Sequence, residues 1–206
     1  MQNRTLVRTA LVATVAAILV LPVVWGQEDG SNAANKTSAA GSAVELLGGL
    51  NHDATATILT APIKTSPTQD LIFSVSLECA LWTTVATVGN EVSQAQATVT
   101  IQVRFDGVPV PVSGSGDDGK VVFCDRTHKQ TTMNLDDDDR IEQYLATRAA
   151  NAFNWLLPDV GGGDHIVEVV AELTTSHAGD EASSEAGIGH RTLMVEPTHL
   201  PQGFAL

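Results

Sequence analysis

The stretch LIFSVSLECALWTTVATV (71–88) carries a two-residue alternation. Apolar side chains recur at every second position and are separated by residues such as Ser74, Ser76 and Glu78; the apolar set is Phe73, Val75, Leu77, Cys79 and Leu81. Successive side chains of a β-strand point to opposite faces, so this period predicts a long strand with one buried face. One buried and one polar face is typical of antiparallel sheets.

The same period recurs on both sides of this segment. Asp106-Gly107 predicts a tight turn, and Pro109 and Pro111 restrict the strand after it to a sheet edge. The further predicted strands cover residues 55–63, 96–105, 108–112, 120–125 with an extension towards 132, 153–157, 165–175 and 188–197. Turn-rich segments such as SGSGDDG (113–119) and SHAGDEASSEAG (176–187) separate them.

One segment predicts a helix. Ile141, Leu145, Ala149 and Ala152 follow one another at spacings of four, four and three, which places them on one side of a helix. Asp139 is a suitable N-cap, and Glu142 three residues later completes a capping box. We therefore expect one short helix inserted between strands.

Together these elements predict an all-β fold, an antiparallel β-sandwich of seven to eight strands with one short inserted helix. The stretch FNWLLPDVGGGDHIVEVVAEL (153–173) resembles a strand pair of immunoglobulin-like and fibronectin III-like extracellular modules. The resemblance implies an Ig-like sandwich and no activity. It covers one hairpin, and the two cysteines do not follow the antibody pattern, because the second one lies on a middle strand.

The N-terminus predicts export. Arg4 and Arg8 precede an apolar run, residues 9–25, which ends before Gly26 and the polar residues that follow. This order is that of a secretory signal peptide, residues 1–26, with cleavage after Gly26. The alternative is an uncleaved membrane anchor, although the run is slightly shorter than a spanning helix of about 20 residues and contains Pro22. We expect a secreted or cell-surface protein.

Beyond the signal, residues 27–53 are rich in Ser, Ala, Gly and Asn and predict a flexible, low-complexity tether. The stretch VELLGGL (44–50) is its one apolar part. The sandwich domain is predicted over residues 54–200, and residues 201–206 form a tail.

The charge balance excludes some partners. The first 26 residues hold two of the 11 Lys and Arg and none of the 24 Asp and Glu, so the remainder carries a formal charge of −15. Such a field repels nucleic acid and anionic lipid. An extracellular protein or glycan is the expected partner, with self-association as a further expectation and membrane contact only if residues 9–25 remain uncleaved.

The two cysteines, Cys79 and Cys124, are expected to pair, because an exported chain with an even cysteine count folds in an oxidising compartment. The alternative is a pair of free buried thiols. Neither cysteine lies in a basic or helix-start context that would make it a nucleophile.

The search for catalytic motifs is negative. The sequence contains no G-x-S-x-G, H-E-x-x-H or P-loop motif, and its six histidines are spread out without metal-ligand spacing. We therefore expect no enzyme and no cofactor.

The acidic run Asp136, Asp137, Asp138 and Asp139 allows two interpretations. Clustered carboxylates supply the oxygen ligands of a calcium site. Alternatively, the acids stabilise the N-terminus of the predicted helix and stay solvated, which the sequence favours, because the order of an EF-hand is missing.

Trp82 lies on the outward phase of its strand. It serves either as a stacking platform for a ligand or as cover for a neighbouring loop or helix, and the second interpretation is favoured.

The leading functional hypothesis is a non-enzymatic, secreted or surface-exposed sandwich module for binding, adhesion or structural assembly. A second is a subunit of an extracellular filament or surface layer, in which the VELLGGL stretch adds to a neighbour's sheet edge. A third is a secreted hydrolase of unrecognised type, with acids in the loops between residues 113 and 140.

Overall fold

The computed structural model describes residues 36–47, 51–67, 69–113, 116–133, 136, 138–179 and 181–198. All of them belong to the compact unit that spans residues 32–206. The predicted signal peptide and the C-terminal tail lie outside the described residues. Among the residues that are described, no helix has the length and the apolar character needed to cross a bilayer.

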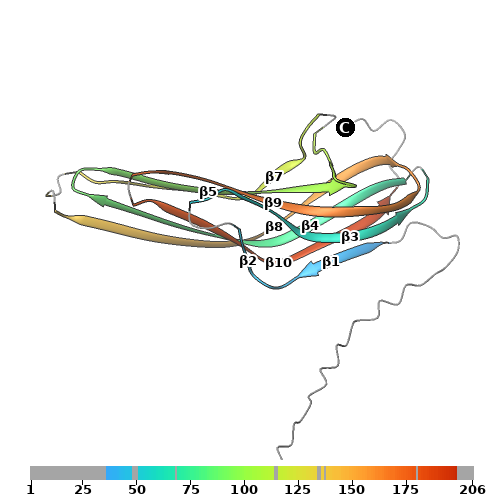
Figure 1. The fold of residues 1–206 in the computed structure, drawn as a ribbon, viewed down its shortest axis with the longest axis horizontal. Coiled ribbons are helices and arrows are strands. Elements are labelled where there is room, and N and C mark those ends of the chain that lie inside the picture. The colour runs from blue at the N-terminus through green and yellow to red at the C-terminus, as the bar shows by residue number, and fades with distance from the viewer. Residues whose placement is uncertain are drawn as a thin grey trace, which may run out of the picture. The chain divides into compact units, whose positions relative to one another are not determined.

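The described residues form two antiparallel sheets of five strands each (Figure 1). Sheet A has the order β1-β10-β4-β8, and β2 also pairs with β10; its strands are β1 (Thr37–Gly41), β2 (Glu45–Leu47), β4 (Gln69–Val88), β8 (Arg140–Val160) and β10 (Ser183–Thr198). Sheet B has the order β3-β9-β5-β6, and β7 also pairs with β5; its strands are β3 (Ala54–Thr65), β5 (Val92–Phe105), β6 (Val108–Pro109), β7 (Lys120–Thr131) and β9 (Gly163–Ala178).

The two-residue period predicted the strands correctly because one face of each sheet is buried against the other sheet. In β4, the residues Leu71, Phe73, Val75, Leu77 and Leu81 are each 2% exposed or less. Inward residues of sheet B, among them Val99, Ile101, Val103, Val167 and Val169, are fully buried opposite them. The all-β, antiparallel sandwich architecture is therefore confirmed.

The predicted helix over residues 141–152 is wrong, because these residues belong to the long strand β8. Their pairing with β4 runs without interruption from Leu71↔Leu157 to Val88↔Arg140. Spacings of four also fit a strand, since every second residue shares a face and Ile141, Leu145 and Ala149 are all odd-numbered. Backbone pairing with β4 decides between the two periods, and the side-chain pattern alone could not.

The segment assigned to a tether also differs in part from the prediction. Two of its parts, Thr37–Gly41 and Glu45–Leu47, pair with β10. The described part of the VELLGGL stretch therefore joins the chain's own sheet A. Leu47 is 1% exposed and anchors the segment in the core. Small residues such as Ala39 and Gly41 carry little hydrophobic signal, although all five residues of β1 pair with β10. Residues 27–35 and 48–50 lie outside the described part.

The interior changes character along the sandwich. The large apolar side chains, with Trp155 and Phe73 among the largest, fill the part that we call the apolar half, which contains Leu71–Leu81 of β4 and the residues packed on it. Beyond Leu81, in the part that we call the polar half, the apolar interior is reduced to Val85, Ala95 and Ala182. Apart from Ala86, its other buried side chains are polar: Thr83, Thr87, Ser93, His128, Gln130, Thr132 and Ser184.

Candidate binding surface

The most unusual surface belongs to β8. Its first 13 residues, Arg140–Ala152, are all exposed, although they form a regular strand. β8 is the last strand of sheet A, and none of the described strands pairs with its other edge. The strand therefore presents a long row of backbone hydrogen-bonding groups to solvent.

A backbone hydrogen bond at the start of β8 shows which backbone groups of this strand are free. The Gly89 N–H donates to the Asp139 carbonyl at 2.9 Å, which continues the ladder beyond Val88↔Arg140. The backbone of Asp139 therefore faces β4. Because successive residues direct their backbone groups to opposite sides of a strand, the odd-numbered residues of β8 face β4 and the even-numbered ones face the free edge.

The opposite side of β4 leads to the same assignment. The N–H and the carbonyl of Ser184 in β10 both bond Asn51, at 2.7 and 3.1 Å, and so they point away from β4. Thr83, the β4 partner of Ser184, must then bond β8, where its partner is Leu145. The free N–H and C=O groups thus belong to Glu142, Tyr144, Ala146, Arg148 and Ala150.

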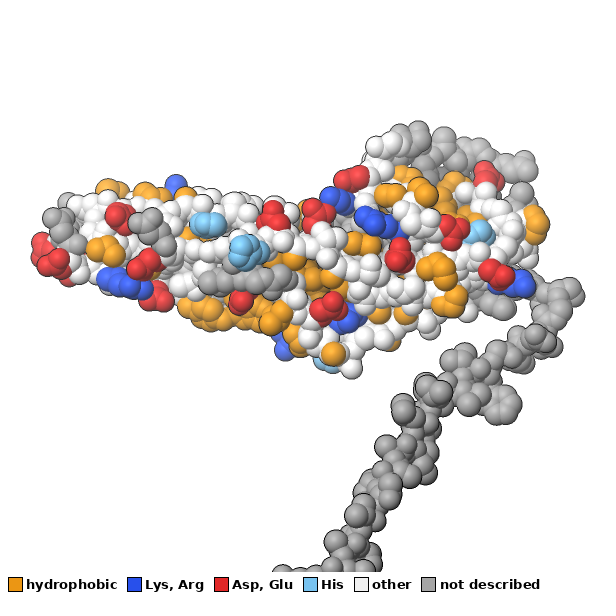
Figure 2. Space-filling model, viewed as in Figure 1, with side chains coloured by type: hydrophobic (Ala, Val, Ile, Leu, Met, Phe, Trp, Pro, Cys, Tyr) orange, Lys and Arg blue, Asp and Glu red, His pale blue; other side chains and the backbone are white. Residues whose placement is uncertain are grey.

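The side chains of this stretch differ between its two faces. On the phase that points towards sheet B, Ile141 and Leu145 remain 38% and 43% exposed. Strand β7 reaches across to β8 with the side chain of His128, whose Nε2 lies 3.1 Å from Oε1 of Gln143. On the outward phase the strand carries Tyr144, which is 62% exposed, between charged residues. Figure 2 shows hydrophobic side chains gathered along the edge that β8 follows in Figure 1.

A charged cluster lies on the outward face of sheet A beside this edge. Glu78 of β4 forms an ion pair with Arg148 of β8, and its Oε2 lies 3.2 Å from Nδ1 of His190 in β10. The hydrogen bond from Arg148, followed by that from His190, holds the pKa of the Glu78 carboxyl below its usual value. Glu78 contributes to the lining of two shallow hollows of about 150 and 350 Å³.

Trp82 lines the smaller of these hollows and is half-buried. It lies over Gly187 of β10, where a Cβ atom would come within 3.0 Å of the Trp82 Cη2 atom. This close approach shows that Trp82 covers β10, and a larger residue at position 187 would require the indole to shift. The indole also borders the hollow next to Arg148, so the stacking interpretation stays a prediction.

The cysteines form a disulfide. Cys79 of β4 and Cys124 of β7 are bonded, with their Cα atoms 6.5 Å apart, and so the bond connects sheet A to sheet B. Cys79 is the buried residue two positions before Leu81, the last residue of the apolar half on β4. A disulfide indicates an oxidising compartment.

The acidic run precedes a strand, so the interpretation that it stabilises a helix N-terminus is wrong. The Asp139 N–H donates to the Asp136 carbonyl at 3.0 Å, while Asp137 lies outside the described residues. Within the described part of the chain, no three His, Cys, Asp or Glu side chains are close enough to hold a metal ion. The calcium site stays a prediction.

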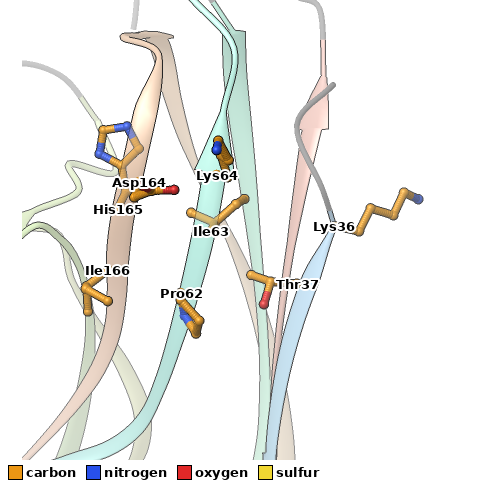
Figure 3. Close-up of a pocket in the computed structure, with 8 residues that line it drawn as sticks. All are labelled: Lys36, Thr37, Pro62, Ile63, Lys64, Asp164, His165 and Ile166. Atoms are coloured by element: carbon orange, nitrogen blue, oxygen red, sulfur yellow. The ribbon is translucent and has the colours of Figure 1, made fainter. Parts of the chain in front are cut away.

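A third hollow, of about 390 Å³, lies beside β1, β3 and β9 (Figure 3). The Lys36 side chain points away from the other labelled residues, and its Nζ pairs with Glu196 at 2.7 Å. His165 stacks on Phe105 and bonds the Asp106 carboxylate at 2.7 Å, which lowers the pKa of Asp106. Ligand sites have converging polar groups, and here Lys36 and His165 are each bonded to a carboxylate that does not line the hollow.

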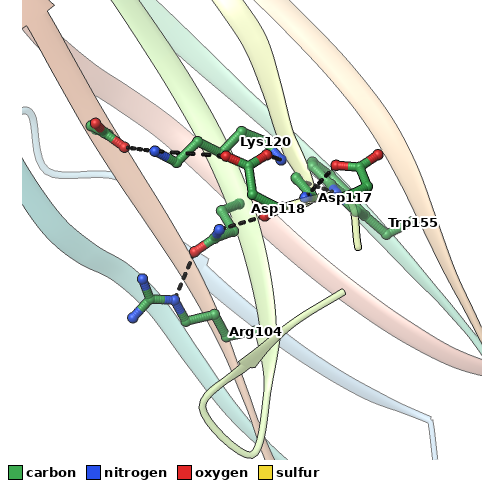
Figure 4. Close-up of polar contacts among 8 residues, drawn as sticks. Arg104, Asp117, Asp118, Lys120 and Trp155 are labelled. Carbon is green, nitrogen blue, oxygen red and sulfur yellow. Dashed lines mark hydrogen bonds and ion pairs between the residues drawn. The ribbon is translucent and has the colours of Figure 1, made fainter. Parts of the chain in front are cut away.

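The loop before β7 is held by its own acids (Figure 4). Asp117 accepts hydrogen bonds from the N–H groups of Gly119 at 2.7 Å and Ser113 at 2.9 Å, and these bonds lower its pKa. The Gly119 carbonyl in turn accepts from the Trp155 indole at 2.9 Å. Asp117 and Asp118 lie at the opposite end of β7 from Asp136, so the two acidic groups do not meet.

The sequence pattern did not reveal the free edge of β8. The stretch RIEQYLATRAANA (140–152) was interpreted as a helix, and exposure on both faces of a strand leaves no two-residue period to detect. The absence of Pro from these 13 residues was a usable signal, since edges that are protected against pairing often carry proline.

No protein-family model matches this chain, and no curated protein matches its sequence. Among solved structures it is similar to a chain in "Structure of infectious bursal disease virus Gx strain", with 15% identity, a TM-score of 0.37, and coverage of 92% of this chain and 37% of that one. A second similarity is to "Crystal structure of infectious bursal disease virus VP2 subviral particle", with 13% identity, a TM-score of 0.14, and coverage of 89% and 44%. The chain spans less than half the length of these viral chains, and similarity at this level carries no argument about what it does.

Proposed function

We propose that this chain is a non-enzymatic module of a secreted or cell-surface protein and that it binds a partner by strand addition along β8. In this mode an extended segment pairs with an exposed sheet edge, where backbone hydrogen bonds supply affinity and side chains supply specificity. The sandwich holds the edge rigidly, because β8 is paired with β4 along its whole exposed stretch.

The observation that carries the proposal is the run of 13 exposed residues with a free edge. Long exposed edges invite pairing with other chains, and natural proteins usually shorten, bend or cover them. Between Arg140 and Ala152 the pairing of β8 with β4 shows no bulge, and the sequence contains no proline. An edge kept flat and accessible in this way is suited to a partner.

The disulfide and the net charge support the location. The Cys79–Cys124 bond fits an oxidising environment, and the excess of Asp and Glu keeps an exported domain soluble. The two-sheet antiparallel architecture is also what the immunoglobulin-like and fibronectin III-like resemblance implies, whereas the position of the disulfide does not follow the antibody pattern. We retain that resemblance as part of the proposal at the level of architecture.

Strand addition is tested with short synthetic peptides that alternate apolar and polar residues, at a protein concentration low enough to disfavour self-association. We expect bound peptides to slow hydrogen exchange at the free N–H groups of Tyr144, Ala146 and Arg148. Ala146→Pro removes one free donor without breaking the ladder to β4, and so it should weaken binding, whereas Ala146→Val should retain it. Peptides that bind the proline variant equally well, or no binding by any peptide, would contradict the proposal.

The absence of catalysis needs a separate measurement. The purified chain is incubated with panels of glycan and peptide substrates, and we expect no turnover. Hydrolysis that is lost in Asp117→Asn or Glu78→Gln would instead favour the hydrolase hypothesis.

A further inference from the structure

We propose that β8 pairs with β8 of a second copy of this chain, antiparallel, in the register that places Leu145 on the two-fold axis. The inference rests on the proposed function, because it names the partner of the same free edge. Three features of Arg140–Ala152 carry it: the direction of the free backbone groups, the positions of the charges and the positions of the apolar side chains.

The backbone restricts the register first. The even-numbered residues of β8 hold the free N–H and C=O groups, and a ladder forms only if these groups face each other. Antiparallel pairing of identical strands must therefore place even-numbered residues opposite even-numbered ones. A two-fold axis on Leu145 does so, since Tyr144 then lies opposite Ala146 of the second copy, and Glu142 lies opposite Arg148 of the second copy.

The charges then select one register. With the axis on Leu145, the outward face carries two Glu142–Arg148 pairs between the copies. Within one copy Arg140 already pairs with Glu142 at 2.9 Å, and Arg148 pairs with Glu78. The contact would join these pairs into a series of alternating charge across the edge. Exposed ion pairs add little affinity, but they select the register.

The neighbouring registers lack this match. Moving the axis to Tyr144 places Arg140 opposite Arg148 of the second copy, and like charges directly opposite each other are destabilising. Moving it to Ala146 places Glu142 opposite an alanine and removes both ion pairs.

The apolar side chains fit the same register. On the phase towards sheet B, Leu145 meets its own equivalent, and Ile141 meets Ala149 of the second copy. The exposed Ile141 and Leu145 thus each gain an apolar partner from the second copy, and pairs of Gln143 with Thr147 of the second copy lie between these apolar pairs. The contact is isologous, so it closes a dimer and does not by itself propagate a filament.

The register is tested by cysteine cross-linking of the full chain. The protein is produced by secretion from the expression host, so that Cys79 and Cys124 form their disulfide. Leu145 lies at a non-hydrogen-bonded pair on the axis, where Cα atoms are about 4.5 Å apart, within disulfide reach. Leu145→Cys should therefore give a covalent dimer on mild oxidation. Thr147→Cys is the matched control, because it lies on the same face but about 13 Å from its equivalent, too far to bridge.

Analytical ultracentrifugation tests association itself. We expect a concentration-dependent dimer whose dissociation constant rises about tenfold or more in Ala146→Pro, because that variant loses two symmetric backbone hydrogen bonds. A wild-type chain that stays monomeric at high concentration overturns the inference, and so does faster cross-linking at Thr147→Cys than at Leu145→Cys. If the chain stays monomeric but still binds peptides, the proposed function stands without the dimer. If it neither dimerises nor binds peptides, both the proposed function and the dimer are contradicted.

Discussion

The apolar and the polar half of the sandwich are built from the same long strands but have different interiors. In the apolar half, β4 and β8 bury Phe73 and Trp155 against sheet B. In the polar half β4 brings Thr83 and Thr87 to the inward face, while Ile141 and Leu145 of β8 stay exposed. The two halves therefore differ in role. The apolar half supplies the stability of the fold, and the polar half holds a free strand edge while burying little apolar area.

The largest expected effect breaks the apolar half. Trp155 is 1% exposed, lies 4.9 Å from Phe153 between ring centroids, and donates to the Gly119 carbonyl. Trp155→Ala should lower the free energy of unfolding by about 3–5 kcal/mol, as measured by denaturant titration. Tyr144→Ala on the exposed part of the same strand should change it by about 0.5 kcal/mol or less. Equal losses would show that the two halves do not differ in this way.

The second-largest expected effect concerns the Cys79–Cys124 disulfide, which lies beside the border between the apolar half and the polar half. The disulfide closes a loop with a sequence separation of 45. Loop-closure entropy predicts that the double variant Cys79→Ala, Cys124→Ala loses up to about 4 kcal/mol. In this double variant, backbone hydrogen exchange should accelerate in the polar half before it does so in the apolar half, because few apolar contacts remain in the polar half. Unchanged stability, with the wild-type chain reduced by a phosphine as a control, would contradict this.

Substitutions inside the polar half have smaller effects and sharpen the comparison. The Thr83 and Thr87 hydroxyls are buried, and neither has a hydrogen-bond partner among the described residues. Thr83→Val should therefore raise the free energy of unfolding by about 1 kcal/mol. The reverse change, Val85→Thr, should lower it by about 1–2 kcal/mol. A loss of stability in Thr83→Val would mean that its hydroxyl is hydrogen-bonded in solution.

The smallest effect is a pH dependence. The hydrogen bonds from His165 and from the Ile166 N–H lower the pKa of Asp106 in the folded state. The resulting stability is present above the unfolded pKa of about 4 and is lost as pH falls through the lower folded pKa. Asp106→Asn should flatten the decline in thermal midpoint below pH 4. If the thermal midpoint of this variant declines below pH 4 as steeply as that of the wild type, the Asp106–His165 contact contributes nothing to stability.

The sequence was informative wherever burial imposes a period. Phe73, Val75 and Leu77 alternate because sheet B covers one face of β4, and Asp106-Gly107 forms the turn because both residues adopt positive φ, 51° and 79°. The stretch Arg140–Ala152 follows no such rule, since neither face is buried, and the spacings of four and three among its apolar residues suggested a helix. The candidate binding surface therefore came from tertiary pairing.

The amino-acid sequence by itself determined the all-β fold, the positions of most strands and the expectation that Cys79 pairs with Cys124, because these follow from local alternation, turn residues and cysteine count. Only the tertiary structure decided that β8 is a strand, that one edge of it is free, and that sheet A includes β1 and β2. Backbone pairing between segments far apart in the chain carries little side-chain signature. It becomes visible only when β4 and β10 are in place to supply the hydrogen bonds.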